Sequence, residues 1–241
     1  MEEHENLYEK IREMLGGNPG SYSILEHQID MDLQMEYYDC SRKLKTEVDE
    51  QWAMDQMQYL YEPGYSIEVK KNILARLATI ERVECYRAIE SFLEQGDESL
   101  RDWTLMSLNE SRMQMESRLL DENQVFISTG LGGRGKKLRY FVVLISRDRR
   151  ELTHTQKKVI QNEFEFVLKK HDAEIEEIRF CDYLSTIQFL MPIHHSLKLM
   201  FKEAIDECNH YGDFLTDHFI ATNVRVLSFE EIKDFIRQKS E

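Results

Sequence analysis

The chain changes its residue pattern near Asn123. Before this point, long stretches of Leu, Met, Gln, Glu and Lys are typical of helices. After it, β-branched and aromatic runs such as Gln124–Thr129 and Leu138–Ser146 are typical of strands. The sequence therefore predicts two domains, an all-helical one over residues 1–122 and an α+β one over residues 123–241.

The second part is expected to alternate strands and helices. Four strands are predicted after a glycine-rich segment, at residues 138–146, 173–180, 186–191 and 219–227. A capping-box pattern at Thr153–Gln156 begins one helix, and a second helix has a spaced apolar face. That face consists of Leu197, Met200, Phe201, Ala204 and Cys208. The strand-helix-strand-strand-helix-strand order resembles the ferredoxin-like βαββαβ topology, with an extra leading strand and an extra trailing helix. Because this fold hosts many unrelated functions, the resemblance predicts no activity.

An internal repeat lies in the first part. Residues 66–77 can be laid over residues 97–108 with an offset of 31 residues, which places Val69 on Leu100. Two amphipathic helices at this period are typical of α-solenoids. The pattern resembles HEAT-like repeats of the phycobilisome-lyase type over residues 66–120, in which Arg87, Ala88 and Ile89 fall on Arg118, Leu119 and Leu120. Such stacks usually need about three units. Helices predicted over residues 23–61 would then act as a cap, and an irregular helical bundle is the alternative. A short helix is also predicted over residues 4–15.

Acidic residues concentrate in the helical part. Residues 1–64 carry 15 acidic and 5 basic side chains, residues 65–123 carry 12 and 8, and residues 124–241 carry 18 of each. This acidity argues against nucleic-acid binding by the helical part, although an acidic surface also favours solubility by itself.

The cysteines and the hydropathy indicate a cytoplasmic protein. The four cysteines are far apart and form no CxxC pair, which is typical of reduced thiols. The first ten residues, MEEHENLYEK, do not resemble a signal peptide, and no apolar run approaches the ~20 residues of a membrane helix. We therefore expect no membrane association.

The segment Gly130–Lys137 matches GxxxxGK, most of a phosphate-binding P-loop. Lys137 stands where a Ser or Thr hydroxyl would hold magnesium, and the residues that follow are β-forming instead of helical. A hairpin connection is the simpler interpretation. The basic side chains of this loop are nevertheless candidates for binding an anion, and they are Arg134, Lys136, Lys137 and Arg139.

Metal binding and covalent catalysis have little support in the sequence. A group of possible metal ligands lies near the C-terminal end, but its spacing is poor for convergence. The group consists of His194, His195, Cys208, His210, Asp213, Asp217 and His218. No GxSxG element is present. We therefore predict no catalytic residue, no metal and no cofactor. Trp103 in the repeat is either a core residue or an anchor for a partner.

The preferred interpretation is a non-enzymatic interaction or scaffold protein that binds another protein, with homo-oligomerisation as a further possibility. Solenoid-like helices form extended binding surfaces, which is the basis of this prediction. One alternative is a regulator that binds an anion or a nucleic acid through the basic hairpin at residues 130–139. Another is an enzyme with a site at the junction of the two domains.

Overall fold

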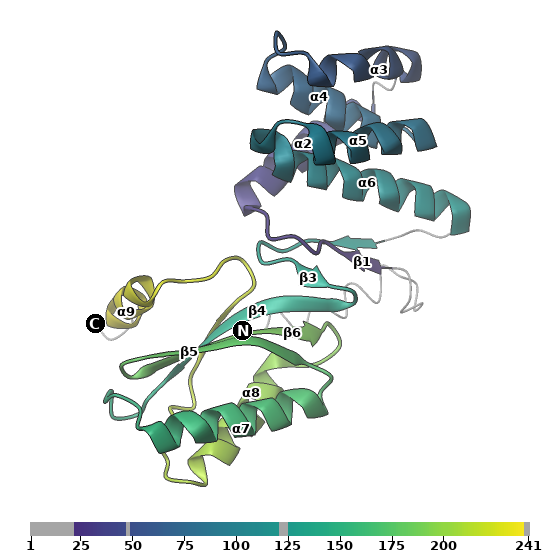
Figure 1. Ribbon diagram of the computed structural model, residues 1–241. Coiled ribbons are helices and arrows are strands. Elements are labelled where there is room, and N and C mark those ends of the chain that lie inside the picture. Colours follow the sequence, from purple (N-terminus) through teal and green to yellow (C-terminus); the bar gives the residue numbers. More distant parts are fainter. Residues whose placement is uncertain (1–21, 47–48, 121–124, 239–241) are drawn as a thin grey trace. The chain divides into compact units, whose positions relative to one another are not determined.

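The structure is a computed structural model, and it describes residues 22–46, 49–120 and 125–238. The chain forms two compact units, which divide between Ile127 and Ser128. The first is built mainly from helices and the second around an antiparallel sheet (Figure 1). The helix predicted over residues 4–15 lies outside the described residues. Among the described residues, no helix combines the length and apolar character needed to cross a membrane.

The helical unit stacks its helices around one apolar core (Figure 1). Its described α-helices are α2 (Met31–Leu44), α3 (Glu50–Gln56), α4 (Ile67–Ala78), α5 (Val83–Gln95) and α6 (Arg101–Leu120), with short 3-10 helices at Met57–Tyr61 and Glu98–Leu100. The side chains of Asp30, Asp49 and Ser66 accept hydrogen bonds from backbone N–H groups at the starts of α2, α3 and α4. Each cap satisfies donors that the first turn leaves without a helical partner.

Helix α6 differs from the repeat predicted for this region. Residues 118–120, expected on a separate partner helix, form the last turn of α6. The physical reason is the absence of a helix breaker, because no Gly or Pro occurs between Arg101 and Leu120. The helix pair α4–α5 is therefore followed by one long helix, and not by a second pair.

The strand predicted at residues 124–129 does not lead the second sheet. Its described part, β2 (Val125–Ile127), pairs in parallel with β1 (Tyr22–Ile24) inside the helical unit. The backbone N–H of Leu25 also donates to the carbonyl oxygen of Ile127 at 2.9 Å. The prediction that this strand leads the second sheet is therefore wrong. The strand pairs instead with a segment about a hundred residues earlier in the sequence.

The second unit is an antiparallel sheet with helices. Its elements are β3 (Gly133–Arg134), β4 (Lys137–Ile145), α7 (His154–Lys170), β5 (Glu174–Cys181), β6 (Leu184–Pro192), α8 (Leu197–Asn209), β7 (Ile220–Thr222) and α9 (Phe229–Gln238). Strand β4 lies next to β6, and β5 pairs with the far edge of β6. The short strands β3 and β7 both pair with β4. The long strands share a register in which Phe141 faces Gln188 and Val142 faces Ile187.

The two faces of this sheet are covered by different helices. On one face, the rings of Phe164 in α7 and Phe201 in α8 are 5.2 Å apart, and Phe201 lies 5.1 Å from Phe189 of β6. On the other face, Phe141 and Leu184 form a cluster with Ile232 and Ile236 of α9. The capping box predicted at Thr153–Gln156 is present at the start of α7. The apolar face predicted for the second helix is also confirmed, because its five members are buried in α8.

Strand β7 is shorter than the strand predicted at residues 219–227. It pairs with only three residues of β4, Phe141–Val143. After Thr222 the chain turns, since the N–H of Val224 donates to the Thr222 hydroxyl at 3.1 Å. The carbonyl of Asn223 accepts from the N–H of Leu131 at 2.9 Å. The β-forming residues beyond this turn therefore line a loop that leads to α9.

Two of the four cysteines behave as small apolar residues. Cys85 and Cys208 are buried, and all four cysteines are free thiols. Burial raises the pKa of the Cys85 thiol to about 11 and that of Cys208 to about 12. Neither thiol is therefore activated as a nucleophile.

Candidate functional site

The glycine-rich segment forms a tight β-hairpin. Gly135 and Lys136 make the turn between β3 and β4, and Gly135 has a φ of +60°, which favours glycine. Lys137 begins strand β4, so no helix N-terminus follows the GxxxxGK sequence. The P-loop interpretation is excluded by this geometry, because a phosphate needs the amides of a helix start.

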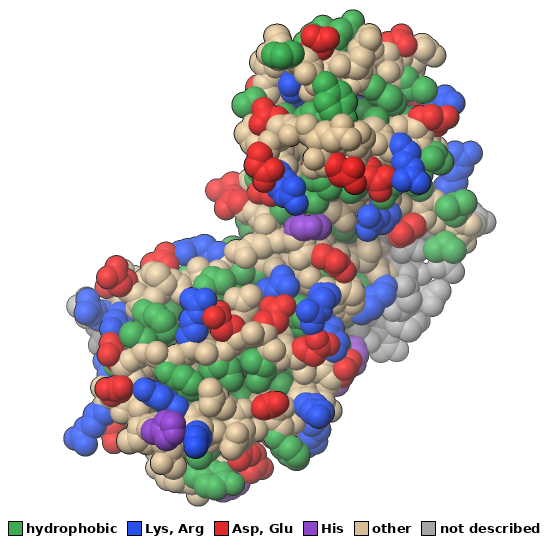
Figure 2. Space-filling view, in the orientation of Figure 1, with side chains coloured by type: hydrophobic (Ala, Val, Ile, Leu, Met, Phe, Trp, Pro, Cys, Tyr) green, Lys and Arg blue, Asp and Glu red, His purple; other side chains and the backbone are tan. Residues whose placement is uncertain are grey.

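Acidic residues of β5 lie against the basic residues of this hairpin. Lys137 Nζ is 2.7 Å from Glu174 Oε1, and Arg134 is also paired with Glu174. Arg139 binds both carboxylate oxygens of Glu176, with its Nε 2.6 Å from Oε2. Hydrogen bonds from Lys137 lower the pKa of Glu174, and one from Arg139 lowers the pKa of Glu176. Three of the four predicted anion-binding residues are therefore already matched to carboxylates. Figure 2 shows blue and red side chains interspersed over the visible face of this unit, without one continuous basic area.

Trp103 lies in the core of the helical unit. Its side chain is 2% exposed, and its ring is 5.1 Å from that of Tyr37. The indole N–H donates to the carbonyl of Lys71 at 2.9 Å, and the Lys71 ammonium lies 4.6 Å from the ring centre. This contact set fits the core alternative for Trp103. The residue lacks the exposure that an anchor for a partner would need.

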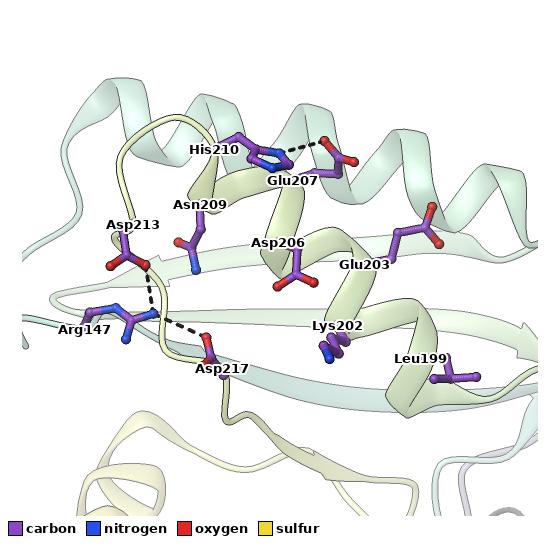
Figure 3. Close-up of a pocket in the computed structure, with 10 residues that line it drawn as sticks. All are labelled: Arg147, Leu199, Lys202, Glu203, Asp206, Glu207, Asn209, His210, Asp213 and Asp217. Carbon is purple, nitrogen blue, oxygen red and sulfur yellow. Dashed lines mark hydrogen bonds and ion pairs between the residues drawn. The ribbon is translucent and has the colours of Figure 1, made fainter.

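A pocket with many charged residues lies along α8, as shown in Figure 3. It is a hollow of about 870 Å³, open to solvent. The residues around it are Arg147, Leu199, Lys202, Glu203, Asp206, Glu207, Asn209, His210, Asp213 and Asp217, and we call it the acidic pocket. Glu203, Asp206 and Glu207 lie on one side of α8 because positions three and four apart share a helix face. The loop after α8 adds Asp213 and Asp217, and Arg147 comes from the residues that follow β4.

The loop side of the acidic pocket is held by Arg147. One of its terminal nitrogens is 2.9 Å from Asp213 Oδ1, 3.3 Å from Asp217 Oδ1 and 2.9 Å from the Leu215 carbonyl oxygen. Asn209 adds two contacts to Leu215, donating to its carbonyl and accepting from its N–H. These bonds fix the loop against the end of α8. The pocket lining has five carboxylates against two permanent cations, Arg147 and Lys202.

The helix side of the acidic pocket keeps its carboxylates more open. Glu203 is paired with Lys170 at 2.7 Å and His171 at 3.1 Å, and hydrogen bonds from these two groups lower its pKa. Glu207 lies 3.3 Å from His210 Nδ1. Asp206 takes part in none of the ion pairs found among the described residues, and its side chain is exposed. The pocket therefore presents unneutralised negative charge to solvent.

The possible metal ligands weighed in the sequence are spread over several places. The acidic pocket contains His210, Asp213 and Asp217, whereas Cys208 is buried in α8. His194 and His195 follow β6, where the ring of His195 is 4.2 Å from His194 and 5.3 Å from His171. Burial, with the neighbouring histidines, lowers the pKa of His195. Within the described ranges, no three His, Cys, Asp or Glu side chains converge as metal ligands do.

The sequence contained the pocket residues but no signal that joined them. Glu203, Asp206 and Glu207 share a helix face in any acidic helix, and Arg147 is separated from Asp217 by 70 residues. Only the loop after α8 brings the two groups together. A basic residue at a strand end and an Asp-rich loop after a helix were the two available clues.

Comparison with known proteins adds little to this site. No protein-family model matches the chain, and no curated protein matches it. A REP-associated tyrosine transposase bound to a REP hairpin is 16% identical over 43% of this chain and 62% of that chain, with a TM-score of 0.33. The chain thus spans less than two thirds of that protein's length. The C-terminal domain of the MgtC protein from Mycobacterium tuberculosis is 14% identical over 39% of this chain and 96% of that chain, with a TM-score of 0.28. At these TM-scores, neither likeness bears on function.

Proposed function

We propose that the protein is a non-enzymatic, cytoplasmic interaction protein that binds a basic segment of a partner protein in the acidic pocket. The observation that carries this proposal is the charge of the pocket, where five carboxylates face two permanent cations. A Lys- or Arg-containing segment would complement this field and would be attracted to it before contact.

The pocket also offers an apolar contact at its edge. Leu199 lines it with 65% of its side chain exposed. A partner residue with an aliphatic side chain next to a basic one would cover Leu199 while its neighbour pairs with Asp206 or Glu207. Burying apolar area adds affinity, whereas charge pairing mainly sets specificity and rate. The proposed occupant is therefore a segment that combines basic and aliphatic residues.

The proposal also includes a specific fold class for each unit, ferredoxin-like for the sheet unit and HEAT-like for the helical unit. The strand order β7-β4-β6-β5, with α7 and α8 on one face, supports a ferredoxin-like class for the second unit. The pair α4–α5, followed by α6, supports a HEAT-like arrangement of the helical unit in its first repeat. Both classes are common frameworks for binding surfaces, so they are compatible with an interaction protein.

The test uses the full chain and a short fluorescent peptide of alternating Lys and Leu, with a Glu and Leu peptide as the opposite-charge probe. The pocket variant carries D206N, E207Q and D213N, each of which keeps the shape of the side chain. Binding is followed by fluorescence anisotropy. We expect the pocket variant to bind the basic peptide about tenfold more weakly, since each exposed charge contact contributes roughly 0.2–1 kcal/mol. Affinity should also fall with added salt.

The matched control removes the same charge elsewhere. The control variant carries E84Q, E94Q and E98Q, three exposed residues of the helical unit. It should bind the basic peptide within about twofold of the unaltered chain, because none of its three substituted residues lines the acidic pocket. Equal weakening in both variants would mean that the peptide reads net charge alone, and the proposal would then be wrong. Absence of binding to the basic peptide would overturn it as well.

A further inference from the structure

A second hollow lies on the sheet face opposite α7 and α8. Helix α9 covers the end of this face where Leu184 lies, and beside it a cavity of about 380 Å³ is left between the sheet and the segment before α9. Phe141, Thr186 and Gln188 form its floor, and Leu227 and Phe229 form one wall. We call this the sheet groove. Its volume falls in the range of about 300–1,000 Å³ typical of small-molecule sites.

The wall of the sheet groove is fixed by backbone contacts. The carbonyl of Asn223 accepts from Leu131, and Gly130 lies so close to Val224 that a Cβ there would be 1.9 Å from the Val224 carbonyl oxygen. Only glycine allows this approach. Farther along, Glu231 accepts from the N–H of Ser228 and donates its own N–H to the Ser228 hydroxyl. The wall is therefore positioned before any ligand arrives, which reduces the entropy cost of binding.

The floor of the sheet groove contains the hydroxyl of Thr186. Thr186 is only 5% exposed, and none of the hydrogen bonds found among the described residues uses its side chain. Gln188 lies next to it on the same face and donates to Glu176 at 3.3 Å. A ligand that displaced water from this hydroxyl without bonding to it would leave the hydroxyl unpaired, whereas a ligand that hydrogen-bonds to it would avoid that cost in free energy. A purely apolar occupant would leave Thr186 unsatisfied.

The rim of the sheet groove carries one charge of each sign. Arg179 Nε lies 2.7 Å from Glu177 Oε1, and both residues, on edge strand β5, line the groove. The start of α9 does not compete for an anion, because Glu231 already caps it and is paired with Arg225 at 2.8 Å. Arg179 is therefore the cation available to a ligand at this groove, and Glu177 is the adjacent anion.

We propose that the sheet groove binds a small zwitterion with an apolar side group, of the chemical class of an aromatic or branched-chain α-amino acid. The ligand carboxylate would pair with Arg179 and its ammonium group with Glu177, exchanging one internal ion pair for two. Its side group would lie between Phe141 and Phe229, and Thr186 and Gln188 would hydrogen-bond to the ligand head group. A ligand of single charge would leave one member of the Glu177–Arg179 pair without a partner. This inference is independent of the acidic pocket.

The test measures binding of L-phenylalanine to the full chain by calorimetry and by NMR. L-leucine, glycine, phenylacetate and phenethylamine complete the panel, because they vary the side group and remove each charge in turn. We expect saturable binding of the two apolar amino acids, and at least tenfold weaker binding of the other three compounds. The variant R179Q should weaken L-phenylalanine binding at least tenfold, and T186V, which keeps the shape, about fivefold.

The matched control is R87Q, which breaks a similar exposed pair with Glu90 on α5. It should leave the affinity for L-phenylalanine unchanged, as should the acidic-pocket variant. The proposal is overturned if no apolar amino acid binds saturably, if R179Q and R87Q behave alike, or if phenylacetate binds as tightly as L-phenylalanine. The peptide experiment tests the acidic pocket and the amino-acid panel tests the sheet groove, so either proposal can fail while the other stands.

Discussion

At the scale of single residues, the helical unit contains a buried carboxylate with a complete set of partners. Glu110 of α6 is 9% exposed and accepts hydrogen bonds from the hydroxyls of Tyr37, at 2.7 Å, and Ser41, at 2.7 Å. Lys45 Nζ is 2.8 Å from Glu110 Oε1. Burial, together with the charge of Glu110, raises the pKa of Tyr37 well above its usual value. The hydroxyl of Tyr37 therefore stays protonated and donates to Glu110.

Replacing Glu110 by Ala should destabilise the helical unit by about 2–3 kcal/mol. Removing Glu110 takes the carboxylate acceptor from the buried hydroxyls of Tyr37 and Ser41, and Lys45, which is half exposed, returns to water at little cost. Urea unfolding followed by tryptophan fluorescence measures this loss. The control E116Q, at an exposed position of the same helix, should change the free energy of unfolding by less than about 0.5 kcal/mol. Equal effects of the two substitutions would contradict a role for the buried cluster.

Residue type alone could not reveal the pairing of the basic hairpin. The sequence shows Lys137 and Arg139 in a basic run, but their partners Glu174 and Glu176 lie 37 residues further on. Strand β6 lies between β4 and β5, and the side chains of Arg139 and Glu176 reach each other across it. Only the strand register shows that these charges neutralise one another. For the same reason, the sequence could not show that Glu177 and Arg179 line a groove together with Thr186.

At the scale of elements, local signals predicted the regular elements and missed the connections. The capping box at Thr153 and the apolar spacing of α8 are determined by neighbours within one or two turns, so the sequence contains them. The pairing of β1 with β2 depends on segments distant in sequence, and no local pattern records it. Strand β7 ended early because its pairing partner, and not its β-propensity, sets its length.

Helix α9 should detach when its apolar face receives a charge. Ile232 is fully buried in the cluster with Leu131 and Phe141, so Ile232→Asp would place an unpaired carboxylate there, at a cost of several kcal/mol. The helix would leave the sheet rather than bury that charge. Hydrogen–deuterium exchange should then show faster exchange over residues 223–238 and unchanged exchange in α8.

The same variant connects α9 to the sheet groove. Because Leu227 and Phe229 form the groove wall, Ile232→Asp should also weaken L-phenylalanine binding at least tenfold. The control is D234N, an exposed substitution on the same helix, which should alter neither exchange nor binding. Unchanged protection of residues 223–238 in the Ile232→Asp variant would show that α9 is held by contacts other than its apolar face.

At the scale of the whole molecule, each unit has its own core, and this predicts two separable unfolding transitions. The apolar cluster of the helical unit is drawn from residues 25–108, and the cluster under α9 is drawn from residues 131–236. Both tryptophans, Trp52 and Trp103, belong to the helical unit. Tryptophan fluorescence therefore reports the helical unit alone, whereas far-UV circular dichroism reports both units.

A core substitution in the sheet unit should accordingly shift only one signal. Phe189 is fully buried against Tyr140 and Phe201, so Phe189→Ala should destabilise its unit by about 3–5 kcal/mol. The urea transition followed by circular dichroism should then separate into two steps, and the midpoint followed by tryptophan fluorescence should stay unchanged. Leu74→Ala in α4, expected to cost about 2–5 kcal/mol, should lower the fluorescence midpoint instead. If Phe189→Ala moved both midpoints equally, the chain would unfold as one cooperative body. Separate transitions would mean that binding to the acidic pocket or the sheet groove stabilises the sheet unit alone, which gives both binding proposals a common thermodynamic readout.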